Sequence, residues 1–259
     1  KKGAPLIAIP TTGGTGSETT PYTIITDTSS DVKMLIGSEH IIPDIAIIDP
    51  TLTLSCPPDL TAAVGIDALC HAIEAYVSKK ANPMSDIFAL EAIRLLYNYL
   101  KTAYIDGSNL EAREKVMMGA TLAGMAFGNS SVTLVHGMSR PIGANFHIPH
   151  GVSNATLLKV VMDFSYSSSL SSYSDIARVM DKDMSNMKEE DAAKKAVDLV
   201  AELISDLNIP SLAKLGIEKE KLRQLAPSMA KAAIDSGSPG NNPRIATEEE
   251  IIELYLKAY

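Results

Sequence analysis

The spacing of apolar positions changes near residue 55 of the chain. Before this point, short runs rich in Ile, Val and Thr alternate with Gly, Ser and Pro, a pattern typical of β-strands. Four such runs predict strands at residues 5–10, 21–26, 32–36 and 43–49. After Pro57 and Pro58, apolar residues recur at the three- and four-residue spacing of helices. The pattern therefore predicts a β-containing segment at 1–54 and an all-helical domain at 55–259.

Capping signals predict where some of the helices begin. Apolar stripes mark helices at residues 84–104, 111–127, 191–207 and 246–259. Asn82 and Pro83 have the pattern of an N-cap followed by proline at the first helical position. Thr247 and Glu250 have the spacing of a capping box. The Ser-rich residues 166–174 are expected to form an exposed turn region.

Composition narrows the class of protein. The chain has 259 residues, of which 46% are hydrophobic and 21% charged, as expected of a globular chain with two domains. The net charge of −8 argues against a nucleic-acid partner. Cys56 and Cys70 are too few for a disulfide framework, so buried reduced thiols and a cytoplasmic location are expected. No apolar run of membrane-spanning length and no signal peptide is expected.

Asp67 and His71 form a polar pair in the otherwise apolar stretch GIDALCHAIEAY (65–76). Residues four apart face the same way on a helix, so a surface ion pair is the commonest interpretation. However, a helix that is apolar nearly all round is typically buried, and a buried carboxylate is costly unless it is paired or binds a metal. A closed structural hydrogen bond between the two side chains also satisfies this requirement.

The other histidines favour a metal site. The chain has five histidines: His40, His71, His136, His147 and His150. Three of them lie in the apolar, Gly- and Pro-punctuated segment VHGMSRPIGANFHIPHG (135–151). Two histidines from this segment and the Asp/His pair would make a four-ligand site suited to Zn²⁺ or Fe²⁺. Spacing alone leaves open which histidines take part. His40 is expected in a surface turn without a role.

The glycine-rich stretch TTGGTGSE (11–18) directly follows a predicted strand. Such a turn lets backbone N–H groups approach a phosphate or ribose, and Thr11, Thr12 and Thr15 add hydroxyl groups. The stretch lacks the G-x-G-x-x-G spacing and no clear helix is expected after it. A plain tight turn explains the glycines equally well.

Four stretches together carry a resemblance to a known family. They are AIPTTGGTGSE, GIDALCHAIEAY, LVHGMSRPIGANFHIPHG and GNNPR (240–244). In this order they resemble the iron-containing (group III) alcohol dehydrogenases, which include lactaldehyde reductases and 1,3-propanediol dehydrogenases. The resemblance implies a dehydroquinate synthase-like two-domain fold, in which an α/β dinucleotide-binding domain precedes a helical metal-binding domain. Residues 1–54 would then be an α/β remnant and 55–259 a complete all-α domain.

The resemblance also implies the ligands of a metal ion. Asp67, His71, His136 and His150 match the family's metal-binding positions, and the ion is usually Fe²⁺ and sometimes Zn²⁺. The metal would act as a Lewis acid on the alcohol or aldehyde oxygen.

For the cofactor, NAD or NADP, the resemblance implies contacts from the glycine-rich loop. The residues concerned are Thr12, Gly13, Gly14, Thr15 and Gly16. Lys33 matches a further cofactor contact, and a solvated strand lysine is the alternative interpretation.

Two departures from the family's pattern affect these expectations. The family's Gly-Gly-Gly-Ser pyrophosphate loop is absent, so the chain is expected to be a carboxyl-terminal fragment that binds NAD poorly. Arg140 stands where many members have a histidine; arginine stays protonated and cannot act as a base. It could orient a polar or anionic substrate or form a structural ion pair. His147 would line the pocket or be a core histidine. No other catalytic residue is assigned.

The function implied by the resemblance is hydride transfer between a small primary alcohol, diol or aldehyde and NAD(P). The expected partners are small molecules and further copies of the chain, with no nucleic acid and no membrane. Two alternatives remain open: a glycerol dehydrogenase-like or dehydroquinate synthase-like enzyme on the same fold, and a non-catalytic helical module for metal binding or oligomerisation.

Overall fold

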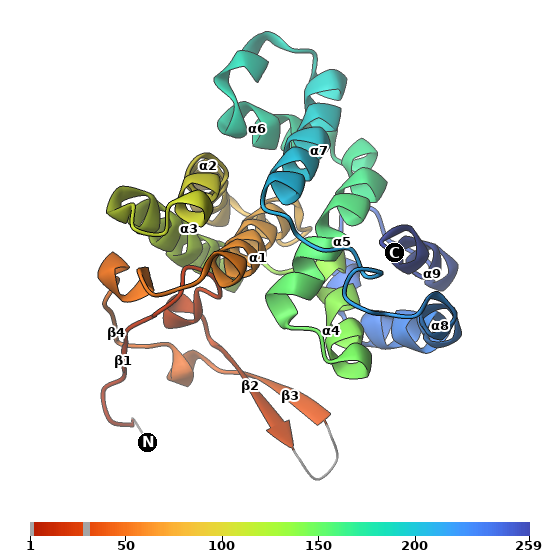
Figure 1. The fold of residues 1–259 in the computed structure, drawn as a ribbon, viewed down its shortest axis with the longest axis horizontal. Coiled ribbons are helices and arrows are strands. Elements are labelled where there is room, and N and C mark those ends of the chain that lie inside the picture. Colours follow the sequence, from red (N-terminus) through yellow and green to blue (C-terminus); the bar gives the residue numbers. More distant parts are fainter. Residues whose placement is uncertain (1–2, 28–31) are drawn as a thin grey trace.

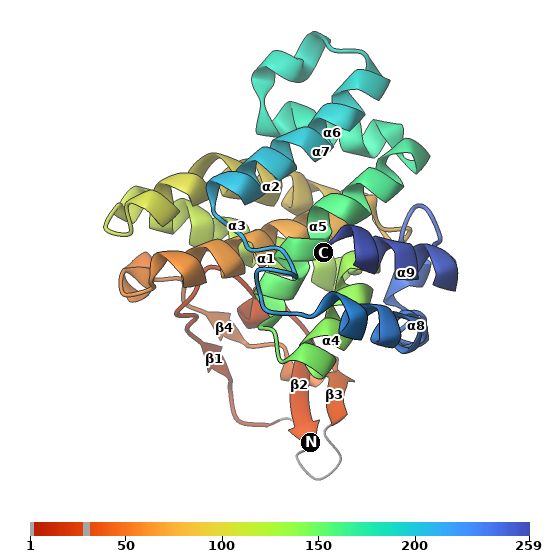
Figure 2. The ribbon, with the colours of Figure 1, turned by 45° about the vertical axis from the view of Figure 1, so that its right-hand side comes forward.

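The computed structural model describes residues 3–27 and 32–259. Within them, a short β-containing segment packs against a larger body of helices (Figure 1). In both views the strands lie at the bottom of this body, α6 and α7 lie at its top, and α8 and α9 lie at its right-hand side (Figures 1 and 2). The expected change from strands to helices is therefore present.

In residues 3–27 and 32–259, the β-structure consists of two separate two-stranded pairs. β1 (Ile7–Ala8) pairs in parallel with β4 (Ile45–Ala46). β2 (Tyr22–Asp27) pairs with β3 (Val32–Gly37) in antiparallel register, with Tyr22 opposite Gly37. All four predicted strands lie where expected, but β1 and β4 are only two residues long. Ile7 and Ile45 are about half exposed, so few side-chain contacts are available to stabilise a longer strand pair.

The helical part is made from long helices and short 3₁₀ turns. The α-helices are α1 (Pro58–Val77), α2 (Pro83–Ile105), α3 (Leu110–Asn129), α4 (Leu134–Phe146), α5 (His150–Ser165), α6 (Leu170–Met180), α7 (Glu189–Asp206), α8 (Lys219–Asp235) and α9 (Glu248–Lys257). Both predicted caps are confirmed. Asn82 accepts hydrogen bonds from the backbone N–H groups of Met84 and Ser85, and Thr247 and Glu250 cap one another's backbone N–H groups.

The expected exposed turn at 166–174 is wrong in its second half. Only Tyr166–Ser168 forms a 3₁₀ turn, and α6 begins at Leu170. Tyr173 and Ile176 are buried, so an apolar stripe at helical spacing outweighs the high serine content.

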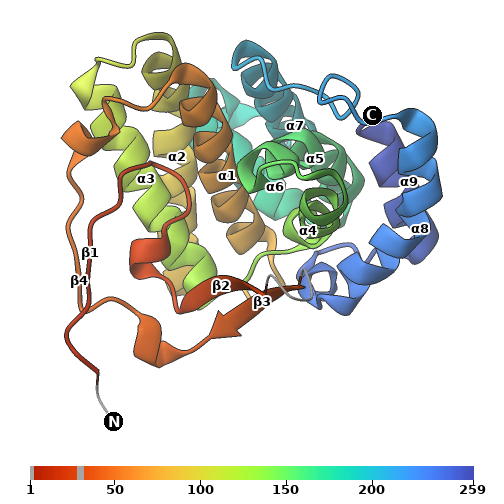
Figure 3. The ribbon, with the colours of Figure 1, turned by 60° about the horizontal axis from the view of Figure 1, so that its bottom comes forward.

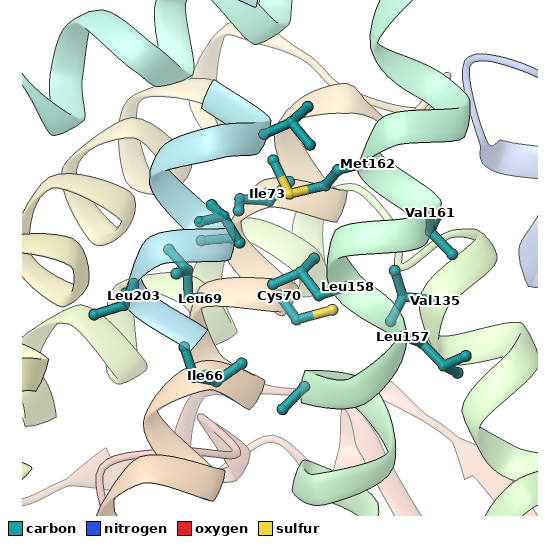
Figure 4. Close-up of a cluster of buried hydrophobic side chains, with 14 of the residues drawn as sticks. Ile66, Leu69, Cys70, Ile73, Val135, Leu157, Leu158, Val161, Met162 and Leu203 are labelled. Carbon is teal, nitrogen blue, oxygen red and sulfur yellow. The ribbon is translucent and has the colours of Figure 1, made fainter. Parts of the chain in front are cut away.

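α1 is the central helix of the fold. It lies between the α2–α3 pair and the α4–α5 pair (Figure 3) and packs against α2, α3 and α5. Figure 4 shows side chains of α1 such as Cys70 and Ile73 gathered with Leu158 and Met162 of α5. Gly65 permits the close packing of α1 on α2, because a Cβ atom there would lie 2.2 Å from the Leu100 side chain.

The burial of α1 also bears on whether this helix could span a membrane. By length and composition, α1 is apolar enough to cross a membrane, but 83% of its most apolar 18-residue stretch is buried inside the protein. The sequence-based expectation of no apolar run of that length is therefore wrong for residues 58–77.

The GNNPR stretch (240–244) holds segments together that are distant in sequence. The Asn241 carbonyl accepts a 2.8 Å hydrogen bond from the Lys79 N–H, and its amide donates to the Ser131 hydroxyl at 2.9 Å. The Asn242 amide donates to Ser165 at 2.9 Å. This motif therefore ties together the segments that follow α1 and α3 and the end of α5.

Candidate metal centre

Three helices bring the four predicted metal ligands together. α1 carries Asp67 and His71, α4 carries His136 and α5 begins with His150. Ligand atoms of Asp67, His71 and His136 all lie within 4.8 Å of one another, and these three residues are buried. The His136 ring centroid is 4.4 Å from that of His71 and 5.2 Å from that of His150, which is exposed. The cluster is thus buried on one side and open at His150.

Local packing explains why these side chains converge. A Cβ atom at Gly151 would lie 2.8 Å from the Ala63 carbonyl oxygen of α1, so only glycine lets the start of α5 approach α1 this closely. On the other side, the His71 ring stacks on Phe127 of α3, with centroids 4.4 Å apart and planes 18° apart. The His71 ring is therefore held in position by a third helix.

The Asn154 amide nitrogen shows what kind of ligand the cluster accepts. It lies 2.6 Å from Asp67 Oδ1, 3.0 Å from His136 Nε2 and 3.1 Å from His150 Nε2. Asp67 Oδ1 can only accept, and each Nε2 accepts in the tautomer that carries its proton on Nδ1; with both histidines in that tautomer, three acceptors face the two protons of one amide nitrogen. Within the described residues, His71 Nδ1 is a further buried nitrogen without a hydrogen-bond partner. A cluster with this excess of acceptors fits a divalent cation.

The charge states of Asp67 and His71 also suit metal binding. Burial lowers the pKa of His71 to about 3, although the neighbouring Asp67 opposes this shift. Burial alone would raise the pKa of Asp67, but the surrounding imidazoles and the Asn154 amide outweigh it and lower the pKa. At neutral pH the pair is therefore carboxylate and neutral imidazole, the forms that bind metal ions.

Two simpler interpretations of the Asp67–His71 pair do not match the structure. Asp67 and His71 are only 3% and 6% exposed, so they do not form a surface ion pair. In the part of the chain that is described, no hydrogen bond joins them, and Asp67 instead accepts from Asn154.

Sequence reasoning missed two residues of this cluster. Glu74, on α1, accepts hydrogen bonds at Oε1 from Thr133 Oγ1 and Val135 N, both at 2.7 Å, and at Oε2 from His136 Nδ1. Asn154 lies one helical turn after His150. The available signal was spacing: Glu74 follows His71 by three positions and Asn154 follows His150 by four, so each lies about one helical turn from a predicted ligand.

Arg140 and His147 lie beside this cluster in sequence. Arg140 follows His136 by one turn of α4 and is partly buried. It makes no hydrogen bond or ion pair with the described residues, so a structural ion pair, one of its two predicted roles, is not observed among them. Burial lowers the pKa of Arg140, while Glu74 opposes this shift. His147 is exposed and has a left-handed backbone with φ 55° at the end of α4, so it is not a core histidine.

The glycine-rich loop packs tightly onto the helices. Gly13, Gly14 and Gly16 are buried. A Cβ atom at Gly14 would lie 2.6 Å from Val64 Cβ of α1, and one at Gly16 would lie 2.6 Å from Gly124 Cα of α3. The packing alone therefore requires glycine at positions 14 and 16, and the contact of Gly13, Gly14 and Gly16 with a cofactor stays a prediction.

The polar residues of the predicted cofactor site, unlike its glycines, are not buried where the structure describes their side chains. Thr12 is half-buried, whereas Thr15 is exposed and donates to the Ser17 hydroxyl at 3.1 Å. Lys33 lies on β3 opposite Thr26, and its side chain is outside the described structure. These positions leave the roles of Thr12, Thr15 and Lys33 as predictions.

Comparison with known proteins identifies the family. The family model described as "Fe-containing alcohol dehydrogenase family, C-terminal" matches residues 61–259, and "Iron-containing alcohol dehydrogenase" matches residues 1–50. The chain belongs to the iron-containing alcohol dehydrogenase family, so the resemblance seen in the sequence is confirmed.

Individual relatives agree with this assignment. The chain is 41% identical over 256 residues to 1,3-propanediol dehydrogenase of Citrobacter freundii, covering 98% of this chain and 65% of that protein. It is 40% identical to lactaldehyde reductase of Escherichia coli, covering 100% and 66% of the two chains. A crystal structure of 1,3-propanediol oxidoreductase superimposes with a TM-score of 0.94 at 40% identity, over 98% and 66% of the two chains. The chain thus spans about 65% of these relatives' length, and the predicted fold class is confirmed.

Proposed function

We propose that this chain contributes the metal-binding part of an alcohol dehydrogenase. The reaction would interconvert a small primary alcohol or diol and its aldehyde, with NAD or NADP as the hydride carrier. The observation that carries the proposal is the convergence of Asp67 Oδ1, His136 Nε2 and His150 Nε2 on the Asn154 amide nitrogen. His71, with its unpartnered buried nitrogen, completes the proposed set of ligands.

The proposed ion is Fe²⁺ or Zn²⁺, since both accept imidazole and carboxylate ligands. When bound, it would supply a Lewis acid that lowers the pKa of the alcohol and polarises the aldehyde carbonyl. Asp67 would provide the negative charge, and His71 would remain neutral because burial keeps its pKa low. Phe127 would hold the His71 ring and exclude water from that side.

The opening of the site would face the substrate. His150 is exposed, so the proposed route for an alcohol or aldehyde passes this edge of the cluster. Arg140, partly buried and without a hydrogen bond or ion pair to the described residues, would orient a polar or anionic group of the substrate. His147 is a second candidate for this entrance. Thr12, Thr15 and Lys33, with the backbone of the glycine-rich loop, would contact the nicotinamide cofactor.

A second candidate function is a metal-binding module that is not catalytic by itself. It is favoured by one observation: Asp67, His71, His136, His150 and Asn154 all come from α1, α4 and α5, so the cluster needs no contribution from the β-containing segment. This candidate predicts metal binding without alcohol oxidation by the chain alone.

Elemental analysis after anaerobic purification tests the shared part of both candidates. About one Fe²⁺ or Zn²⁺ ion per chain is expected for the wild type, as for a single four-ligand site. His150→Ala is expected to lose it. His147→Asn is the matched control, since His147 is an exposed histidine of the same segment and asparagine tolerates its left-handed backbone. Absence of metal from the wild type, even after reconstitution, contradicts the site. If His150→Ala contains as much metal per chain as the wild type, His150 is not a ligand.

A further inference from the structure

Glu74 is a buried carboxylate with no role among the four proposed ligands. It is 2% exposed and lies on α1, three residues after His71. Its Oε1 accepts from Thr133 Oγ1 and from the Val135 N–H, and its Oε2 contacts His136 Nδ1. Both oxygens are therefore engaged at the start of α4, directly behind the ring of His136.

The contact with Oε2 determines which nitrogen of His136 carries a proton. An ionised carboxylate only accepts hydrogen bonds, so His136 Nδ1 must be the donor. A neutral imidazole has one ring proton, and Nε2 is then left as an acceptor. The contact on the opposite side of the ring supports the same tautomer, because the Asn154 amide nitrogen, which can only donate, lies 3.0 Å from Nε2. Asp67 Oδ1 is 3.7 Å from the same nitrogen.

We propose that Glu74 is a positioning residue that holds His136 in the tautomer whose Nε2 is free to bind a cation. Outer partners of this kind orient a metal-binding imidazole and raise its basicity, and their loss typically weakens metal affinity about 10–100-fold. The effect on affinity rests on the metal site of the proposed function. The tautomer of His136 does not, because it follows from the hydrogen bonds of the protein alone.

The same atoms do not form a second metal site. Ligand atoms of Cys70, Glu74 and His136 lie within 4.8 Å of one another. However, Oε2 and Nδ1 are in direct hydrogen-bond contact, which leaves no space for an ion between them. Oε1 already accepts two hydrogen bonds. Glu74 therefore contacts His136, a proposed ligand, from outside the single proposed metal site.

Glu74→Gln tests the proposal because its effect on the tautomer is predictable. The Val135 N–H can only donate, so the glutamine carbonyl oxygen must take the place of Oε1. The amide nitrogen then faces His136 Nδ1 and donates to it. This forces Nδ1 to accept and moves the ring proton to Nε2, the nitrogen required for metal binding. The size and shape of the side chain are nearly unchanged.

The first measurement is the tautomer of His136 in metal-free protein at neutral pH, by long-range ¹H–¹⁵N NMR of labelled histidine rings. The His136 signals are identified by their loss in His136→Gln. The wild type is expected to show the Nδ1–H form and Glu74→Gln the Nε2–H form. An Nε2–H ring in the wild type overturns the proposal, and so does an unchanged tautomer in the variant. If Glu74→Gln does not fold, the wild-type spectrum still decides.

The second measurement is metal affinity by competition with a chelator. Glu74→Gln is expected to bind Zn²⁺ about 10–100-fold more weakly than the wild type. Glu91→Gln, an exposed glutamate on α2 paired with Arg94, is the control and should leave the affinity unchanged. Equal affinity in Glu74→Gln overturns the proposed effect on binding. If the wild type binds no metal, the proposed function loses its site, while the tautomer measurement still tests the role of Glu74.

Discussion

The contact between Gly16 and Gly124 gives a sharp test of how the glycine-rich loop is seated. Gly16 has a left-handed backbone with φ 60°, and its carbonyl oxygen faces α3. A Cβ atom at Gly124 would lie 2.6 Å from that oxygen and 2.5 Å from Thr19 Oγ1. Gly124→Ala therefore cannot be accommodated unless the loop or the helix moves.

Two effects of opposite sign determine the size of the change. Alanine is favoured over glycine inside a helix by about 1 kcal/mol. Overpacking a closed contact costs about 1–3 kcal/mol. If the loop lifts from α3, the 2.6 Å hydrogen bond from Thr121 to the buried Glu18 carboxylate is also weakened, which costs a further ~1.5–3 kcal/mol. The net loss of unfolding free energy for Gly124→Ala is therefore about 0–2 kcal/mol if the loop stays in contact with α3 and about 1.5–5 kcal/mol if the loop lifts.

Urea denaturation of Gly124→Ala and Gly128→Ala measures this effect against a matched control. Gly128 lies on the same helix, but a Cβ atom there would come no closer than 3.7 Å to any neighbour. Gly128→Ala should therefore be neutral or stabilising by up to about 1 kcal/mol. Equal stabilisation by both substitutions would refute the close contact of the loop with α3.

Three further predictions follow from buried polar groups. Burial lowers the pKa of His71 from 6.5 to about 3, so the unfolded chain binds more protons between these two pH values. The metal-free protein should therefore lose about 1.4 kcal/mol of stability per pH unit as the pH falls through this window; equal stability at neutral and mildly acidic pH in urea denaturation would contradict this. Tyr255→Phe removes the 2.7 Å hydrogen bond to the buried Met138 carbonyl and should cost about 1–3 kcal/mol, measured by thermal unfolding; an unchanged melting temperature would contradict it. Arg113→Lys should lower the stability by a similar amount or more. The buried guanidinium donates to Thr61 Oγ1 and to two backbone carbonyls, and one ammonium group cannot reach all three together. Retention of wild-type stability in urea denaturation would count against this prediction.

Local signals in the sequence predicted the helix starts well. The caps at Asn82 and Thr247 use hydrogen bonds between residues two or three positions apart, so the chain carries this information without its tertiary structure. The change from strand-like to helical spacing likewise predicted the order of the elements. The matching motifs predicted Asp67, His71, His136 and His150 as a group, although their role as ligands stays a prediction.

Only the tertiary structure revealed how these four residues are held. Glu74 contacts His136 across 62 positions of sequence, and Asn154 contacts Asp67 across 87. Such contacts depend on how closely helices approach, and therefore on small residues such as Gly151 rather than on local propensity. The sequence by itself determined the elements and the chemistry available, because both depend on neighbouring residues. Packing between distant helices decided which acceptors converge and which nitrogen of His136 faces them.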